Sequence, residues 1–238
     1  MSDVFLYLAG LGIAGYFFWF WLEDYRANSQ LIRDHLADQA SSVTDSVKAA
    51  LEFRKGMPGA TPARWTAILV AVLGALLILG TEVAGEYQLG VVEDQSTMSI
   101  LFGIYTLAAA FIEELIFRGF FFFDRYGKKW LWGSILLISI FFALIHPYIW
   151  SYEVPENQPP WLFWKYLGLN IWEENGQLNI QPIFATCILF INSVWFYLVR
   201  FFPPNRYRSL IPCVAAHLAS NLGVFLVKAY QGKIDAFF

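Results

Sequence analysis

Residues 98–123 read MSILFGIYTLAAAFIEELIFRGFFFF, and this run determines the class of fold open to the chain. It is long enough to cross a bilayer, because about 18 or more mostly apolar residues span the hydrocarbon core as a helix. It also carries three charged side chains, Glu113, Glu114 and Arg118. An ionised group at that depth costs roughly 2.5–3.5 kcal/mol on insertion scales and usually faces a bundle interior. The run therefore predicts a membrane helix with a functional site on it.

Five further runs are apolar and long enough to cross a bilayer. They are residues 4–22, 65–85, 130–150, 182–202 and 210–227. Only 15% of the 238 residues are charged, against about 25% in soluble domains, and the mean hydropathy is +0.49. A net charge of −3 leaves no basic surface for nucleic acid. The sequence predicts an all-α, polytopic membrane bundle of about six transmembrane helices.

Two further features fit a membrane protein: the first apolar run and the positions of the two cysteines. Asp3 is the only charge before residues 4–22, and no small-residue cleavage site follows them, so we predict a true span rather than a secretory signal. Cys187 and Cys213 both lie in apolar runs, which predicts two buried small side chains rather than a disulfide or a zinc site.

The only long polar stretch, residues 23–64, separates the first two spans. We predict a solvated, partly helical excursion that breaks around Pro58 and carries no chemistry. His35 is expected to be a surface histidine within it. The chain is then divided at residue 97: residues 1–97 hold two spans and the cytoplasmic excursion, and residues 98–238 form a helical catalytic bundle.

The distribution of basic residues predicts the orientation. Most of the 16 Lys and Arg residues lie in the first, third and fifth loops, whereas the second loop, 86–97, has none. Loops rich in Lys and Arg face the cytoplasm, so both termini are predicted outside. The fourth loop contains an aromatic segment, 161–172, that is too short to cross and is expected at the outer interface.

Spacing assigns different surroundings to the two adjacent glutamates. Neighbouring residues on an α-helix point about 100° apart, and residues four apart share a face. Glu114 can therefore pair with Arg118, which leaves Glu113 without a local cation and suited to a general base. The alternative is a buried ionic network that only joins helices.

Two other spans carry a histidine paired with a residue four positions away. In one, Phe142 can support the imidazole of His146. In the other, His217 and Asn221 share a face and can donate toward one point, as an oxyanion site requires. Taken alone, a histidine such as His146 is more often an interhelical polar contact than a catalyst, and the pair of His217 and Asn221 could equally be such a contact.

A carboxylate, a histidine and a two-donor face together fit hydrolysis of an acyl bond by activated water. No Ser or Cys is spaced to act as a nucleophile with the histidines. Glu113, His146 and His217 could alternatively hold zinc, although the HExxH pattern is absent and the ligands would come from three helices.

The motifs EExxxR at Glu113, FxxxH at Phe142 and HxxxN at His217 resemble those of the CAAX-protease and bacteriocin-processing family. This family is also called the Abi or type II CAAX prenyl endopeptidase family. All three motifs occur in the family order, each on its own predicted span, and they cover roughly half of the chain. The two N-terminal spans match no family pattern.

The resemblance implies an intramembrane endopeptidase that needs no metal. Glu113 then activates water with the help of His146, and His217 and Asn221 stabilise the oxyanion. It assigns Glu114 and Arg118 to a structural pair. We expect a membrane-associated peptide or protein as substrate, the lipid bilayer as surroundings, and a bacterial inner membrane as location.

Two other classes of function stay open from the sequence. One is a membrane scaffold or regulator that keeps the fold and uses the polar core for helix packing. The other is a transporter or ion channel with a coupling site, for which Glu82 and Asn192 are the only additional polar candidates in the spans.

Overall fold

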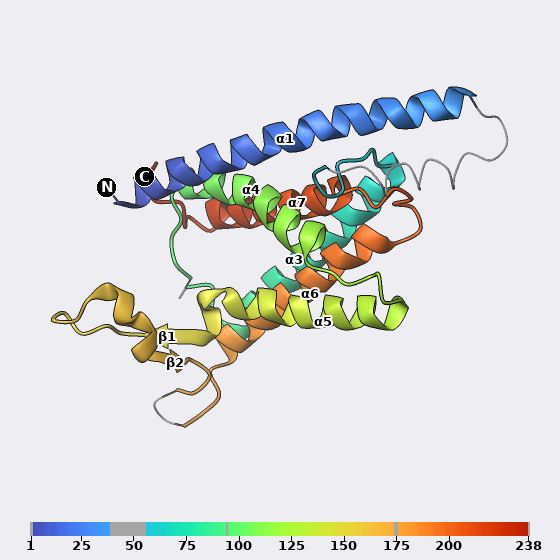
Figure 1. Ribbon diagram of the computed structural model, residues 1–238. Coiled ribbons are helices and arrows are strands. Elements are labelled where there is room, and N and C mark those ends of the chain that lie inside the picture. The colour runs from blue at the N-terminus through green and yellow to red at the C-terminus, as the bar shows by residue number, and fades with distance from the viewer. Residues whose placement is uncertain (1, 39–55, 94, 174–175, 238) are drawn as a thin grey trace.

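The computed structural model describes residues 2–38, 56–93, 95–173 and 176–237, and within them six helices are long and apolar enough to cross a membrane (Figure 1). This confirms the predicted all-α membrane bundle. The helices are α1 (Ser2–Asp38), α3 (Trp65–Leu89), α4 (Ile100–Glu114), α5 (Lys128–Ile145), α6 (Ile180–Phe201) and α7 (Ile211–Tyr230).

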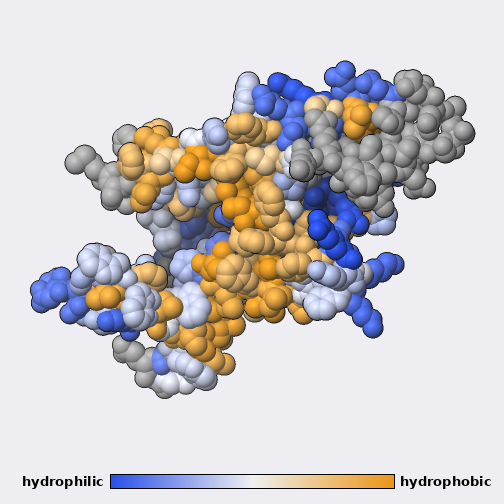
Figure 2. All heavy atoms as spheres, in the orientation of Figure 1, coloured by the Kyte–Doolittle hydropathy of each residue, from blue (hydrophilic) through white to orange (hydrophobic). Residues whose placement is uncertain are grey.

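Helix α3 lies against α7 and α6, α4 lies between α1 and α7, and α5 packs on α6 (Figure 1). Small side chains allow the close approach of α3, because Ala67, Ala71 and Ala75 are four apart and fully buried. Large apolar side chains point outward instead, as Leu77 and Leu137 do. Figure 2 shows the resulting band of hydrophobic atoms across the middle of the molecule. Such a surface fits lipid rather than water.

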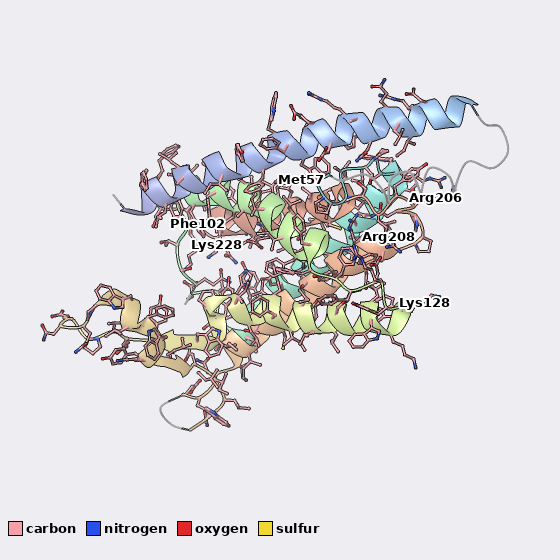
Figure 3. All side chains as sticks on the ribbon, in the orientation of Figure 1. Met57, Phe102, Lys128, Arg206, Arg208 and Lys228 are labelled. Atoms are coloured by element: carbon pink, nitrogen blue, oxygen red, sulfur yellow. The ribbon has the colours of Figure 1, made fainter. Side chains whose placement is uncertain are left out.

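The two termini lie at one end of the bundle, and the third and fifth loops lie at the other (Figure 1). Lys128, Arg206 and Arg208 mark that second end in Figure 3. The basic loops thus gather on one side, as the sequence predicted, while the side that faces the cytoplasm stays a prediction. Arg200, near the start of the fifth loop in the sequence, lies in α6 and is buried, so it does not add to the basic surface of that loop.

Helix α5 ends five residues before the predicted boundary at Trp150. The cause is Pro147, because a residue that precedes proline is pushed out of the helical conformation. His146 accordingly has φ −78° and ψ 143° and lies just beyond the helix. The chain then forms a short antiparallel pair, β1 (Trp150–Tyr152) with β2 (Leu167–Leu169).

The aromatic segment 161–172 forms most of a short helix (Pro160–Lys165) and strand β2, with Trp161 and Trp164 exposed. Its role at an interface stays a prediction. Cys213 is buried as expected, but Cys187 is exposed on α6, so that part of the prediction is wrong. A cysteine that faces outward on a spanning helix is compatible with lipid, because its side chain is apolar.

The polar stretch after the first span divides into three parts. Helix α1 continues as far as Asp38, residues 39–55 and the side chain of His35 lie outside the described residues, and residues 56–64 pack onto the bundle. There Gly59 O accepts from Leu210 N at 3.0 Å, and the Ser209 hydroxyl donates to Thr61 O at 2.5 Å. These residues are not solvated as predicted, because their carbonyls are bound to the segment that leads into α7.

A glycine is required at position 59 for two reasons: its backbone is left-handed, and Leu210 leaves no room for a side chain. Its φ is +62°, and a Cβ there would lie 2.7 Å from Leu210 Cγ and 2.9 Å from the Leu210 backbone nitrogen. The division of the chain at residue 97 is not tested by this contact and stays a prediction.

We predict that Gly59→Ala lowers the free energy of unfolding by about 1–3 kcal/mol, the range typical of an unfavourable backbone conformation. The measurement is thermal unfolding of the purified protein in detergent. Gly80→Ala is the matched control, since Gly80 is helical with no atom within 4 Å of an added Cβ, and it should be neutral or slightly stabilising. Equal midpoints for the two variants would contradict the prediction.

Candidate active site

Helix α4 continues into a π-helical turn, Leu115–Phe120, immediately after the two glutamates. The wider turn changes the direction of backbone carbonyls, and π-turns often occur at functional sites. Side chains of α6 bind these carbonyls: the Tyr197 hydroxyl lies 2.7 Å from both Phe117 O and Phe121 O. Arg200 Nε donates to Arg118 O at 3.3 Å. The turn is thereby held against α6.

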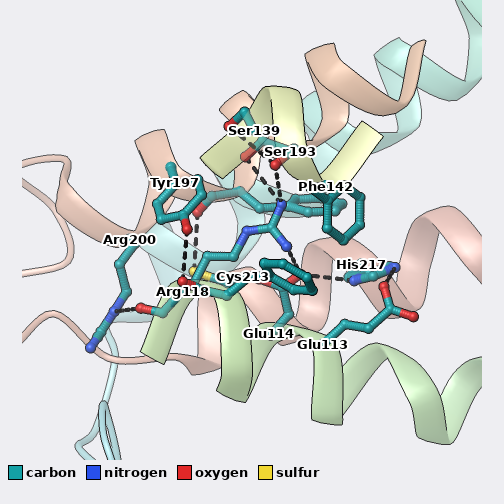
Figure 4. A network of polar contacts seen from close by, with 12 residues as sticks. Glu113, Glu114, Arg118, Ser139, Phe142, Ser193, Tyr197, Arg200, Cys213 and His217 are labelled. Atoms are coloured by element: carbon teal, nitrogen blue, oxygen red, sulfur yellow. Dashed lines mark hydrogen bonds and ion pairs between the residues drawn. The ribbon is translucent and has the colours of Figure 1, made fainter. Parts of the chain in front are cut away.

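Glu114 and Arg118 form the ion pair expected from their spacing. Arg118 Nη1 lies 3.1 Å from Glu114 Oε1, and both side chains have no exposed surface. Arg118 Nη2 also donates to Ser193, at 2.7 Å to the hydroxyl and 3.2 Å to the carbonyl, and the Ser193 hydroxyl contacts that of Ser139 at 3.1 Å (Figure 4). The pair therefore joins α4, α5 and α6.

Aromatic rings enclose the guanidinium. Its carbon lies 4.6 Å from the ring centroid of Phe142, 5.1 Å from that of Phe196 and 5.0 Å from that of Tyr197. A cation over such ring faces is stabilised by the ring quadrupole, most strongly when water is excluded. The sequence did not identify Ser139, Ser193 and Tyr197 as partners of Arg118; a polar stripe on α6, Asn192-Ser193 followed by Tyr197 and Arg200, is the signal that could have done so.

His217 of α7 connects the buried pair to Glu113. Its Nδ1 lies 2.8 Å from Glu114 Oε1, and its Nε2 lies 3.9 Å from Glu113 Oε2 (Figure 4). The imidazole stacks on Phe196 with centroids 4.9 Å apart. Since Glu114 is a carboxylate paired with Arg118, Nδ1–H donates to it and the tautomer of His217 is set by that bond.

Glu113 differs from its neighbour in exposure: 31% of its side chain is exposed, against none for Glu114. It faces a cavity of about 310 Å³ that is also lined by His146, His217 and Asn221. The four residues assigned catalytic roles from the sequence thus share one cavity, whereas Glu114 and Arg118 lie behind its wall. Figure 2 shows the surface hollowed here, with hydrophilic atoms in the depth.

His146 is oriented by the end of helix α5. The last carbonyls of a helix have no intrahelical partner, and one of them, Phe142 O, lies 2.8 Å from His146 Nδ1. The Phe142 ring also lies 4.8 Å from the imidazole. Support from Phe142 was predicted, but its carbonyl contributes as well as its ring.

Asn221 lies on the same cavity but its amide is engaged with α4: Nδ2 donates to Thr106 O at 2.9 Å. Tyr148 lies beyond the spans and also lines the cavity. Burial raises the pKa of the Tyr148 phenol, and the carboxylates of Glu82 and Glu86 raise it further, so the hydroxyl remains protonated and can donate.

Across the described parts of the chain, no three His, Cys, Asp or Glu side chains are grouped to hold a metal ion. This holds for Glu113, His146 and His217, the set considered for zinc. Whether the reaction uses a metal stays a prediction, which a chelator tests below.

The fold and the embedded polar site are those of a polytopic membrane protein with a candidate hydrolytic centre. Residues 95–223, more than half of the chain, match the family described as type II CAAX prenyl endopeptidase Rce1-like. The chain belongs to this family, which confirms the resemblance carried by the three motifs. Membership places it among membrane-embedded peptidases. No curated protein and no solved structure matches the chain.

We predict that Arg118→Met destabilises the protein by roughly 3–5 kcal/mol, because it leaves the Glu114 carboxylate buried without its cation. Unfolding in detergent measures the effect. Arg208→Gln is the control, since Arg208 pairs with Asp124 at the surface and such pairs contribute about 1 kcal/mol or less. Adding Glu114→Gln to Arg118→Met should restore part of the loss, and no restoration would contradict this account.

Proposed function

We propose that the protein is an intramembrane endopeptidase that hydrolyses a peptide bond of a membrane-associated peptide or protein with water activated by Glu113. One observation carries the proposal. Two adjacent glutamates have opposite surroundings: Glu114 is fully buried and paired with Arg118, whereas Glu113 is open to the cavity that His146, His217 and Asn221 also line.

Glu113 and His146 are suited to bind and activate the water. The Nδ1–H of His146 donates to Phe142 O, which leaves Nε2 to accept a hydrogen bond from water in the neutral ring. Glu113 takes the proton as the water oxygen bonds to the carbonyl carbon of the substrate. It then gives this proton to the leaving amine as the C–N bond breaks, so the carboxylate is regenerated.

His217 and Asn221 are suited to stabilise the oxyanion, under two conditions that the geometry sets. Because Nδ1–H of His217 already donates to Glu114, Nε2 can donate as well only when the ring is an imidazolium. Asn221 must release Thr106 O and turn toward the substrate carbonyl. Two donors aimed at the developing charge then lower the barrier.

We also propose that the reaction needs no metal and that the protein acts in a cell membrane. The same polar contacts favour one alternative function. The bonds of Arg118 to Ser193 and of Asn221 to Thr106 join helices, so a non-catalytic membrane scaffold or regulator would use them equally well.

We predict that Glu113→Gln reduces peptide cleavage by roughly 10²–10⁴-fold, the contribution typical of a general base. Its unfolding midpoint should stay unchanged, because the side chain is partly exposed and lies 3.9 Å from His217 without contacting Arg118. The assay incubates purified protein in liposomes with a pool of membrane-anchored peptides and reads the products by mass spectrometry. Glu156→Gln, an exposed carboxylate outside the spans, is the control with full activity.

A strong chelator should leave cleavage unchanged. Loss of cleavage on chelation, with recovery on adding zinc, would instead assign Glu113, His146 and His217 to a metal site. Full function of Glu113→Gln in cells would favour the scaffold.

A further inference from the structure

The cavity has a second group of polar side chains that the proposed reaction does not use. Glu82 of α3 and Asn192 of α6 both line it. Neither belongs to the three motifs, and Glu82 precedes the region that matches the family. Both present oxygen acceptors at membrane depth, where an acceptor without a donor is costly.

Asn192 is the stronger indication of a ligand. Its side chain is 7% exposed, and its Oδ1 has no hydrogen-bond partner among the residues that the structure describes. The large majority of buried polar atoms in folded proteins have a partner. Because Asn192 lines the cavity, rotation of its amide brings the orphaned Oδ1 to the cavity, where a ligand can supply the missing donor.

Glu82 also lacks a cation. None of the ion pairs within the described ranges involves it, and the charged group that acts on it electrostatically is another carboxylate, Glu86. A carboxylate without a partner inside a membrane protein is costly, and such residues usually bind or transfer a charged group.

Within the described ranges, the carboxylates of the cavity have no lining Lys or Arg to balance them. Glu82 and Glu113 line it, and no Lys or Arg is among the described residues that do so. A peptide that ended inside the cavity would place its C-terminal carboxylate beside two glutamates. Like charges at short range repel strongly where water is scarce, so the cavity is poorly suited to a free C-terminus and well suited to a cation.

We propose that Glu82 and Asn192 form a substrate-recognition subsite for a Lys or Arg side chain of the peptide: Glu82 binds the cationic group and Asn192 Oδ1 accepts a hydrogen bond from the peptide N–H. The substrate is then a chain that continues past the cavity and carries a basic residue near the cleaved bond. This inference rests on the proposed peptidase function, whose substrate class it narrows.

Binding tests the subsite without requiring cleavage. The protein used is the full chain with Glu113→Gln in maltoside micelles, which removes both hydrolysis and the other acid of the cavity. The probes are a fluorescent, end-capped apolar peptide with one Lys, its twin with norleucine at that position, and the Lys peptide with a free C-terminal carboxylate. Fluorescence anisotropy gives the three dissociation constants.

We expect the Lys peptide to bind about tenfold more tightly than its norleucine twin, since a hydrogen bond to a charged group contributes about that factor. Adding Glu82→Gln should abolish the preference, whereas Glu86→Gln, one turn away and outside the cavity lining, should keep it. Asn192→Leu should weaken the binding of both capped peptides by a similar factor. The free carboxylate should weaken binding of the Lys peptide.

A Lys preference that survives Glu82→Gln, or tighter binding of the free C-terminus, would overturn the subsite. The separate cleavage assay distinguishes the two proposals. Cleavage without any charge preference would leave the peptidase function and refute the subsite. A preference that depends on Glu82 in a protein that cleaves nothing would establish the binding site and refute the peptidase.

Discussion

The ion pair between Glu114 and Arg118 is the constraint on which the site depends. Its charges have no exposed surface, and a buried pair is tolerated only when further hydrogen bonds satisfy it. Ser193 supplies these from α6, and His217 supplies one from α7. The need to satisfy two buried charges therefore sets how α4, α6 and α7 face one another.

That arrangement separates the two glutamates chemically. Because neighbours on a helix differ in direction by about 100°, fixing Glu114 toward Arg118 turns Glu113 to the cavity. The resulting carboxylate is close to an imidazole, His217, but is not neutralised by arginine. A group that must take up and release a proton needs such surroundings, whereas a group that only positions others does not.

Much of this could be predicted from the sequence, because hydrophobic length and four-residue spacing are local properties. They predicted six spans and the pairing of Glu114 with Arg118. The partners of that pair could not be predicted in the same way: Ser193 is a lone hydroxyl in an apolar helix, and its role depends on how α6 is rotated against α4. The bond from Asn221 to Thr106 likewise requires the relative position of two helices. The span predicted as 130–150 was too long at its C-terminal end, since Pro147 disturbs the helix and α5 ends at Ile145.

The four-residue spacing of Glu114 and Arg118 also has a consequence for membrane insertion, because the ribosome makes the helices in the order of the sequence. Helix α4 reaches the insertion machinery before α6 and α7 exist, so its buried charges must be tolerated there without Ser193 or His217. Placing Glu114 and Arg118 in one helix lets them neutralise each other during insertion, which reduces the cost of bringing charge into lipid. His217 lies in α7, so the set of polar side chains around Glu114 is complete only after that helix has been made.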